Sequence, residues 1–386
     1  MHRISVGVLV GVLMLLAASQ GCGWSGRSAG PRWINGSSQD YPADLYLLGV
    51  GQADSQPVAA ERAYGAVAKI FKAEVAAQSR EWESFLVMER RGQPNTERRL
   101  TLDHITKVST DKVLENISII DTWHDRKSGQ YYALAGTNRA QAATALVEQI
   151  AELDRAVETE VGESRQTQDK LAKVRNLRRA VKNLIVRDAY NGDLRVVRPS
   201  GRGIDPAYRV PELTAELEQF LAASLMVGVE VIGEQSELTR QAVIEGLIRE
   251  GLPVTNRTMG EQNGLDEPAA GPLPQLLVKG AVRLWDVPVP DPRFRYVRWC
   301  SDFVIIEIDT ERLVGAVSIG GKEGHVTPLE ARAKAVRIMQ QELASSLSKT
   351  LAGYVYGETD PPASLPPSAC PMRDETVIPS PAIRPL

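Results

Sequence analysis

The sequence predicts an α+β fold with two modules of antiparallel strands and packed helices, separated by a helical hairpin. Three observations predict it. Both halves of the chain contain short runs in which apolar residues alternate, as in half-buried strands. Both halves also contain apolar residues at three- and four-residue steps, as in amphipathic helices, and a long helical pattern lies between them. The length of 386 residues exceeds one typical core, so we expect at least two domains.

The first module spans residues 41–150 and begins with a short strand from Tyr46. Gly49 and Gly51 interrupt this strand, which suggests a bulge or a close approach of two backbones. A helix follows in AAERAYGAVAKIFKAEVAA, where apolar residues recur at helical spacing. The last two strands of the module form a hairpin around the turn DRKSG. The three strands after the helix are predicted over residues 84–90, 113–125 and 130–136.

The helical hairpin is predicted over residues 151–190. Apolar residues form one stripe over 146–157 and another over 171–184, and the sequence between them turns polar at 162–167. This break favours two helices folded back on each other. A single solvated helix that bridges the modules is the alternative.

The second module spans residues 205–357, after a boundary rich in Gly and Pro at 191–209. Ser236 is expected to cap one of its helices. The last helix begins at T-P-L-E, which joins a capping Thr327, a Pro at the first helical position and a Glu that reaches back to the cap. Residues 358–386 are rich in proline and poor in apolar residues, so we expect them to be disordered. The strands of this module are predicted in VGVEVIG, QLLVKGAVRLW, YVRWCSDFVIIEID and LVGAVSIGG.

Residues 1–21 have the features of a secretory signal peptide, because a basic residue precedes an apolar block too short to span a bilayer. Cys22 follows directly, and the polar segment 22–40 suits a tether. We therefore predict that Cys22 becomes acylated and anchors the protein. Ser19 and Gln20 depart from the usual lipidation pattern. Ordinary cleavage after Ser19, which would leave a soluble periplasmic protein, is the alternative.

The chain contains three cysteines, so no disulfide framework is expected to carry the fold. If Cys22 is acylated, Cys300 and Cys370 could pair. The favoured interpretation is that Cys300 is a buried free thiol, because it lies in an apolar strand while Cys370 lies in the Pro-rich tail.

No catalytic or metal-binding pattern is complete. The segment GAVSIGGKEGH resembles a phosphate-binding loop, yet an extra glycine precedes Lys322, and Glu323 stands where a Ser or Thr should bind magnesium. A strand that ends in a glycine turn explains the same residues. Ser318 misses the nucleophile-elbow spacing by one residue, and the histidines are scattered. We therefore expect no enzymatic activity, no metal site and no cofactor.

The segment FRYVRWCSDF interleaves aromatic residues with arginines, a composition that can bind sugars or peptides. Together with the preceding loop WDVPVPDPR, it predicts a surface for contact with a protein or a glycan such as peptidoglycan. An ordinary strand whose aromatic residues pack inward is the alternative. With 45 basic and 48 acidic residues, the net charge of −3 argues against nucleic acid as a partner. The residues assigned to this surface are Arg295, Arg298, Trp299 and Trp285.

In PRWINGSSQDYPADLYLLGVGQAD, an aromatic and glycine pattern precedes an Ala-rich helix. With this pattern the chain resembles the Lpp-twenty outer-membrane lipoprotein family over about residues 31–150. The resemblance extends weakly to residue 357, since similar chains also have a long helical insertion, an exit like LRVV at 194–197 and a second module. The second module resembles the TolB amino-terminal type of fold. The resemblance implies a bacterial lipoprotein on the periplasmic face of the outer membrane, without enzymatic activity. The residues that carry it are Trp33, Tyr46, Gly49 and Gly51.

We therefore expect a non-enzymatic envelope lipoprotein that acts as an assembly or scaffold factor for a periplasmic or outer-membrane structure, with a flagellum among the machines that it could serve. Its expected partners are the outer membrane, through a lipid on Cys22, and envelope proteins or further copies of itself. The alternative is a soluble periplasmic module that binds a cell-wall or peptide ligand.

Overall fold

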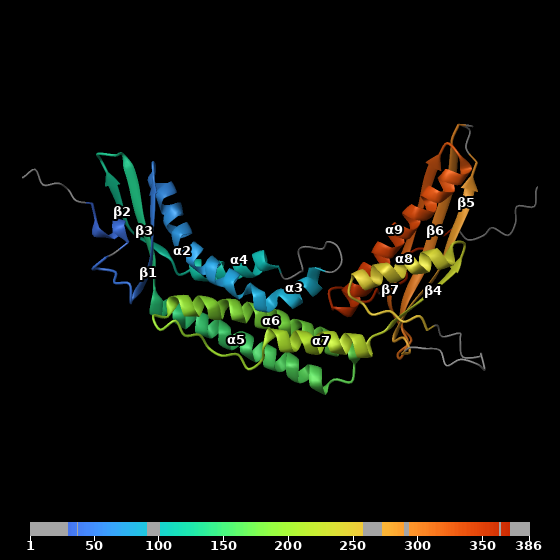
Figure 1. Cartoon of the computed structure of the whole chain (residues 1–386), viewed down its shortest axis with the longest axis horizontal. Coiled ribbons are helices and arrows are strands. Elements are labelled where there is room, and N and C mark those ends of the chain that lie inside the picture. Colours follow the sequence, from blue (N-terminus) through green and yellow to red (C-terminus); the bar gives the residue numbers. More distant parts are fainter. Residues whose placement is uncertain are drawn as a thin grey trace, which may run out of the picture. The chain divides into compact units, whose positions relative to one another are not determined.

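The computed structural model describes residues 30–36, 38–90, 101–257, 272–288, 293–362 and 364–370 (Figure 1). Its helices and strands confirm the α+β fold class. The chain divides into two compact units. Unit 1 combines the chain up to residue 67 with residues 117–137, and unit 2 combines residues 68–116 with the chain from residue 138 onward. Among the described residues, no helix has both the length and the apolar character needed to cross a membrane.

Unit 1 is built around a three-stranded sheet in the order β1-β3-β2. β2 and β3 form the predicted antiparallel hairpin, in which Ser118 lies opposite Gly136. Gly129 donates its backbone N–H to the carbonyl of Asp125 at 2.8 Å and has a φ of 71°, a conformation that glycine adopts without strain. The strands are β1 (Tyr46–Ala53), β2 (Ser118–Asp125) and β3 (Gln130–Asn138).

Trp33 ties the start of the described chain to this sheet. It lies on the short 3-10 helix η1 (Arg32–Asn35) and is buried. Its indole N–H donates to the carboxylate of Asp121 on β2 at 2.8 Å. A residue that carries the family resemblance therefore fixes the N-terminal segment on the hairpin.

β1 packs closely against α2 (Gln56–Gln78) at two glycines. A Cβ atom at Gly51 would overlap with backbone atoms of Ala59 and Ala63, and a Cβ atom at Gly49 would lie 2.7 Å from the carbonyl oxygen of Ala63. Real Cβ atoms do not approach other atoms so closely. The predicted close approach of two backbones is therefore confirmed.

Two helices occupy positions where strands were predicted. The predicted strand at 84–90 is helical, and the start of the predicted strand at 113–125 is the end of another helix. Trp82, Phe85 and Leu86 are buried at three- and four-residue steps, which is the spacing of a helix face. These helices pack against α6 and α7, so tertiary packing decides between the two structures. The elements are η2 (Ser79–Trp82), α3 (Glu83–Arg90) and α4 (Leu102–Leu114).

The predicted helical hairpin is confirmed. It is longer than the predicted range 151–190, because Asn138 caps its first helix by accepting a hydrogen bond from the backbone N–H of Ala140 at 2.9 Å. Asp169 caps the second helix in the same way, accepting from Leu171 at 2.8 Å. α7 packs against α6 and shares its apolar core. The helices are α5 (Arg139–Gln166), α6 (Lys170–Val197) and α7 (Val210–Ser224).

The second sheet of unit 2 has the order β4-β5-β6-β7. β4 pairs parallel to β5, and the other pairs are antiparallel. The sheet is therefore mixed, whereas antiparallel strands were expected, because α8 lies between β4 and β5 in the chain and carries it back to the same end of the sheet. α8 and α9 cover one face. The elements are β4 (Val227–Gly233), α8 (Ser236–Arg249), β5 (Leu276–Val287), β6 (Arg295–Glu307), β7 (Arg312–His325) and α9 (Pro328–Val355).

Of the two predicted helix caps, one is confirmed. The hydroxyl of Thr327 accepts a hydrogen bond from the backbone N–H of Glu330 at 3.3 Å and donates to its carboxylate at 2.7 Å. Ser236, by contrast, is the first residue inside α8. The N-cap is Gln235, at a φ of 59° and with no side-chain hydrogen bond to the helix. The prediction for Ser236 was therefore wrong by one position.

The chain after α9 returns to the sheet. Cys370 forms a disulfide with Cys300 on β6, so the favoured interpretation of Cys300 as a free thiol was wrong. The pairing occurs because β6 directs Cys300 away from α8 and α9, toward the side where the chain returns. We name residues 364–370 the strap. They belong to the segment 358–386 for which disorder was expected, and residues 371–386 lie outside the described residues.

Candidate functional site

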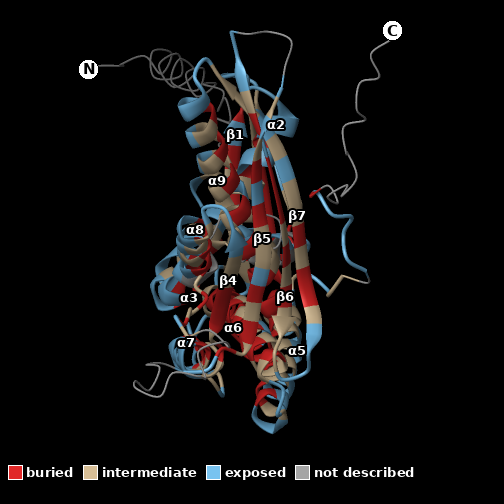
Figure 2. Ribbon diagram, turned by 90° about the vertical axis from the view of Figure 1, so that its right-hand side faces the viewer, coloured by how far each residue is buried: buried red, intermediate tan, exposed pale blue. Residues whose placement is uncertain are grey.

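The second sheet of unit 2 has two faces of different character. On β6, Val297, Trp299, Phe303 and Ile305 are buried under α8 and α9. The residues between them point to the opposite side, because successive side chains of a strand alternate. Buried and exposed bands accordingly alternate along β5 and β7 in Figure 2. We name the side away from the helices the outer face. Its polar and aromatic residues include Arg283, Trp285, Tyr296, Arg298, Asp302, Ser318 and Lys322.

A group of aromatic and basic residues lies at one end of this outer face. Trp285 on β5 is directly opposite Arg298 on β6, which is directly opposite Lys322 on β7. Tyr296 lies two residues before Arg298, over Gly324, where its ring occupies the space that a side chain would need. The Nζ atom of Lys322 is 4.4 Å from the centroid of the Tyr296 ring. We name these four residues, Trp285, Tyr296, Arg298 and Lys322, the cationic patch.

The structure brings together two of the four residues predicted to bind a ligand. Trp285 and Arg298 are neighbours in the cationic patch. Trp299 is only 2% exposed and lies over Gly321 in the core, which corrects its assignment to the surface. Arg295 is exposed, but the alternation along β6 places it on the side opposite to Arg298.

Tyr296 and Lys322 were not assigned to the predicted surface. Lys322 lies in the glycine-rich segment that resembles a phosphate-binding loop, but this segment is paired with β6 along its whole length. The expected strand is confirmed, but the expected glycine turn was wrong, because β7 continues through Gly320, Gly321 and Gly324 to His325. The alternation of apolar residues in YVRWCSDFVIIEID could have placed Tyr296 and Arg298 on one side and Trp299 on the other.

The strap crosses the middle of the outer face and is fixed there by Asp302. The hydroxyl of Ser368 donates to the Asp302 carboxylate at 2.5 Å, and the backbone N–H of Ala369 donates to it at 3.1 Å. Ser318 on β7 donates to the same carboxylate at 2.5 Å. Burial raises the pKa of Asp302, but these hydrogen bonds outweigh burial and hold its pKa below the ordinary value. Asp302 is therefore an ionised anchor for the strap.

An apolar groove of about 410 Å³ lies between the strap and the sheet. Ile232, Ala281 and Val304 line it from the sheet, and Leu365 and Pro366 line it from the strap. Ile232 and Leu365 are 63% and 59% exposed. Asp302, Ser318 and Ser368 also line the groove, but both serines donate to the Asp302 carboxylate, so the space that remains suits an apolar group.

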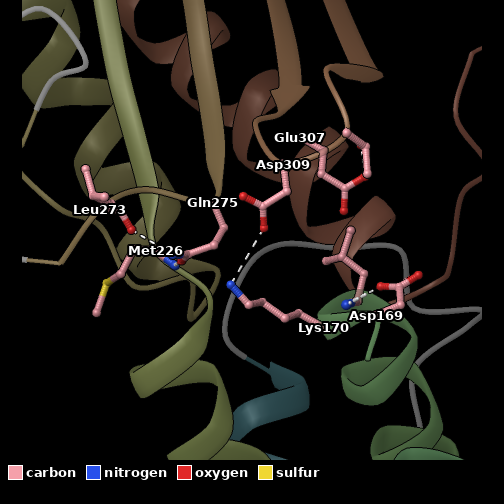
Figure 3. A network of polar contacts seen from close by, with 9 residues as sticks. Asp169, Lys170, Met226, Leu273, Gln275, Glu307 and Asp309 are labelled. Atoms are coloured by element: carbon pink, nitrogen blue, oxygen red, sulfur yellow. Dashed lines mark hydrogen bonds and ion pairs between the residues drawn. The ribbon is translucent and has the colours of Figure 1, made fainter. Parts of the chain in front are cut away.

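The hairpin formed by α5 and α6 meets the opposite end of the sheet (Figure 3). Lys170, at the start of α6, reaches Asp309 in the turn between β6 and β7 at 3.8 Å. Gln275 next to β5 accepts a hydrogen bond from the backbone of Met226 at 2.7 Å and donates to the carbonyl of Leu273 at 2.8 Å. Both sets of contacts join structural elements of unit 2.

Two arginines of α6 also bind the end of α9. Arg175 donates to the carbonyl of Tyr354 at 2.6 Å, and Arg178 donates to the carbonyl of Tyr356 at 3.0 Å. Their guanidinium groups lie 4.7 and 4.8 Å from the ring centroids of the same two tyrosines. Basic groups at the carboxyl end of a helix satisfy its last carbonyls and its dipole. The hairpin and the second sheet are therefore tied together within unit 2.

A buried ion cluster lies between α5 and α6. The fully buried Arg187 donates to the carboxylate of Asp154 at 2.9 Å and lies 3.6 Å from Asp188. Burial raises the pKa of Asp188 to about 6, although the charge of Arg187 opposes this rise. The cluster joins α5 to α6, so its role is structural.

The described residues form no group of His, Cys, Asp and Glu that could hold a metal ion. Ser318 donates to Asp302, whereas His325 pairs with the carboxylate of Glu330 at 2.7 Å. These two residues therefore do not form a nucleophile and its base. Cys22, the predicted lipidation site, lies outside the described residues.

The comparisons with known proteins give one family match. Residues 31–138 match the model of the LPP20 lipoprotein family. This range contains Trp33 and the glycines of β1, which were the basis of the resemblance. No curated protein sequence matches the chain.

Three solved structures share features with the chain. The secreted protein HP1454 from Helicobacter pylori has 14% identity and a TM-score of 0.36, and the alignment covers 80% of this chain and 97% of that one. A minor lipoprotein from Acinetobacter baumannii has 10% identity, a TM-score of 0.26 and coverages of 36% and 96%. The rare lipoprotein B from Shewanella oneidensis has 12% identity, a TM-score of 0.24 and coverages of 33% and 94%.

Likenesses with such TM-scores assign neither a fold nor a function, and the resemblance of the second module to the TolB amino-terminal fold stays a prediction. The family match covers the sheet of unit 1 and the helices that precede its hairpin. Through residues 31–138, the chain matches the LPP20 lipoprotein family, and this match supports a lipoprotein of the bacterial cell envelope.

Proposed function

We propose that this protein is a non-enzymatic lipoprotein of the outer membrane, anchored through Cys22, and that it acts as an assembly or scaffold factor for a periplasmic or outer-membrane structure. The observation that carries the proposal is the match of residues 31–138 to a lipoprotein family. A signal-like segment that ends at Cys22 supports the anchor.

The contacts within unit 2 support a scaffold role. Arg175 and Arg178 bind the end of α9, and Lys170 binds the turn after β6. A hairpin braced in this way holds its own surfaces at fixed positions, as an assembly factor requires.

The anchor is tested by the intact mass of the protein purified from bacterial membranes. We expect a mature chain that begins at Cys22 and carries a diacylglyceryl group and an acyl chain, found in the outer-membrane fraction of a density gradient. Cys22→Ala should release the protein into the periplasm. A wild-type chain that begins near Gln20 and carries an unmodified Cys22 would refute the anchor.

The scaffold role is tested by chemical cross-linking in intact cells, followed by mass spectrometry of the products. We expect a discrete cross-linked species that contains a second envelope protein or a second copy of this chain, and we expect its yield to fall in the Cys22→Ala variant. A chain that stays monomeric at every cross-linker concentration would contradict the role.

A soluble periplasmic module that binds a cell-wall or peptide ligand is the second candidate. The cationic patch favours it, because the patch gathers two cations and two aromatic rings on one exposed face. The density-gradient fractionation described above separates the two candidates, because the soluble module requires that the wild-type protein be found in the periplasmic fraction and not with the outer membrane.

A further inference from the structure

We infer that the cationic patch is a contact surface for peptidoglycan, with Trp285 against sugar rings and Arg298 and Lys322 against the carboxylates of the stem peptides. The inference rests on the proposed location in the envelope, since the protein must reach the cell wall. It does not require the lipid anchor, because a soluble periplasmic form would meet the same polymer.

The charges of the outer face are distributed unevenly. Toward the strap, Lys279 pairs with Glu230 at 3.3 Å, and Asp302 is occupied by Ser318 and by the strap. Around the cationic patch, the described parts of β5, β6 and β7 direct no carboxylate to this face. The patch is therefore a local positive surface on a chain whose net charge is −3.

The geometry of the patch suits an extended polymer. Adjacent strands lie about 4.8 Å apart, so the row of Trp285, Arg298 and Lys322 spans about 10 Å across the sheet. Tyr296 is held in place by the space that Gly324 leaves beneath it and by the Lys322 ammonium. A row of one half-exposed indole and two cations across three adjacent strands can follow an extended glycan strand.

The chemistry of the patch selects this polymer over two others. A membrane surface would require several apolar side chains that enter the acyl layer, whereas the patch offers two aromatic rings, one of them covered by a lysine, and a third ring, Phe294, lies 6.4 Å from Tyr296. The vesicle measurement below therefore tests the membrane directly. Nucleic acid is disfavoured by the net charge and by the predicted export. Peptidoglycan presents sugar rings next to carboxylates. The patch presents a half-exposed indole, which can stack on a sugar ring, next to two cations, which can pair with carboxylates.

The test is co-sedimentation with purified peptidoglycan sacculi, using the full chain purified from membranes in mild detergent. We expect the wild-type protein to bind, the double variant Arg298→Glu, Lys322→Glu to lose at least about tenfold in affinity, and Trp285→Ala to lose several-fold. Arg295→Glu is the matched control, because it makes the same charge change on an exposed position of the same strand but on the other side. It should bind within about twofold of wild type.

Three outcomes would overturn the inference. The first is a wild-type protein that does not sediment with sacculi. The second is a double variant that binds as well as wild type while circular dichroism shows both to be folded. The third is binding to phosphatidylglycerol vesicles in place of sacculi, with loss in the double variant, which would assign the patch to a lipid surface. The intact mass tests the anchor independently, so either idea can fail while the other stands.

Discussion

The disulfide between Cys300 and Cys370 should be a major source of stability for the second sheet. The bond closes a loop with a sequence separation of 70 residues, which contains the second half of β6, all of β7 and all of α9. Chain-entropy arguments give about 4 kcal/mol for a loop of this length. The double variant Cys300→Ala, Cys370→Ala should lose most of this, because the hydrogen bonds from the strap to Asp302 fix only the last residues of the loop.

The measurement is urea unfolding at 25 °C, followed by circular dichroism, for the oxidised wild type, the reduced wild type and the double variant. We expect the midpoint of the transition of unit 2 to fall by more than about 1 M in the reduced protein and in the variant. Cys22→Ala is the matched control, since it removes a cysteine but leaves this bond intact. If the reduced wild type and the double variant unfold at the midpoint of the oxidised protein, the assignment of this stability to the bond is wrong.

Three further predictions concern the packing of both units. Gly51→Ala should destabilise unit 1 by about 1 to 3 kcal/mol in urea unfolding, because its Cβ would meet the backbone of α2. Gly65→Ala on α2, where a Cβ has free space, should instead stabilise unit 1 by up to about 1 kcal/mol. Equal effects of the two variants would contradict the close packing of β1 on α2. Because the pKa of Asp188 is raised to about 6, the folded state keeps a proton that the unfolded state releases above about pH 4. The free energy of unfolding should therefore fall by about 2 kcal/mol as the pH rises from 4 to 6. In urea unfolding at pH 4 and pH 6, Asp188→Asn should remove most of this decrease in the free energy of unfolding. An unchanged decrease in the variant would show that another group causes it. Thr327→Ala should lower the free energy of unfolding by about 1 kcal/mol in urea unfolding, because α9 loses its cap. Ser236→Ala should lower it less, since Ser236 is not a cap. A larger loss from Ser236→Ala than from Thr327→Ala would contradict both assignments.

Elements with local signals could be predicted from the sequence. The T-P-L-E motif fixes the start of α9 because capping depends only on neighbouring residues. The hairpin of β2 and β3 follows from the glycine turn at Gly129 in the same way. α3 could not be predicted, because SFLVMER is too short for its period to separate a helix from a strand. Its structure depends on contacts with α7, which lies far away in the sequence.

In the candidate site, too, features with local signals could be predicted from the sequence, and features that depend on long-range contacts could not. Alternation along β6 contains enough information to separate Arg298 from Trp299, although composition alone put both on one surface. The register that brings Arg298 next to Lys322 depends on the turn between β6 and β7 and on an irregularity at Ile305 and Ile306, which the alternation of residues along one strand does not reveal. The pairing of Cys300 with Cys370 is likewise a long-range feature, which depends on where the chain returns after α9.

The glycines of β7 connect the fold to the inferred function. Gly321 and Gly324 leave space on opposite sides of the same strand, and an aromatic ring from β6 fills each space. On the inner side the ring of Trp299 completes the core, and on the outer side the ring of Tyr296 lies flat beside Lys322. A glycine pattern that resembles a phosphate-binding loop is thus explained by packing. It follows that the functional chemistry of this segment resides in its lysine, which the glycine on the outer side helps to position through the tyrosine.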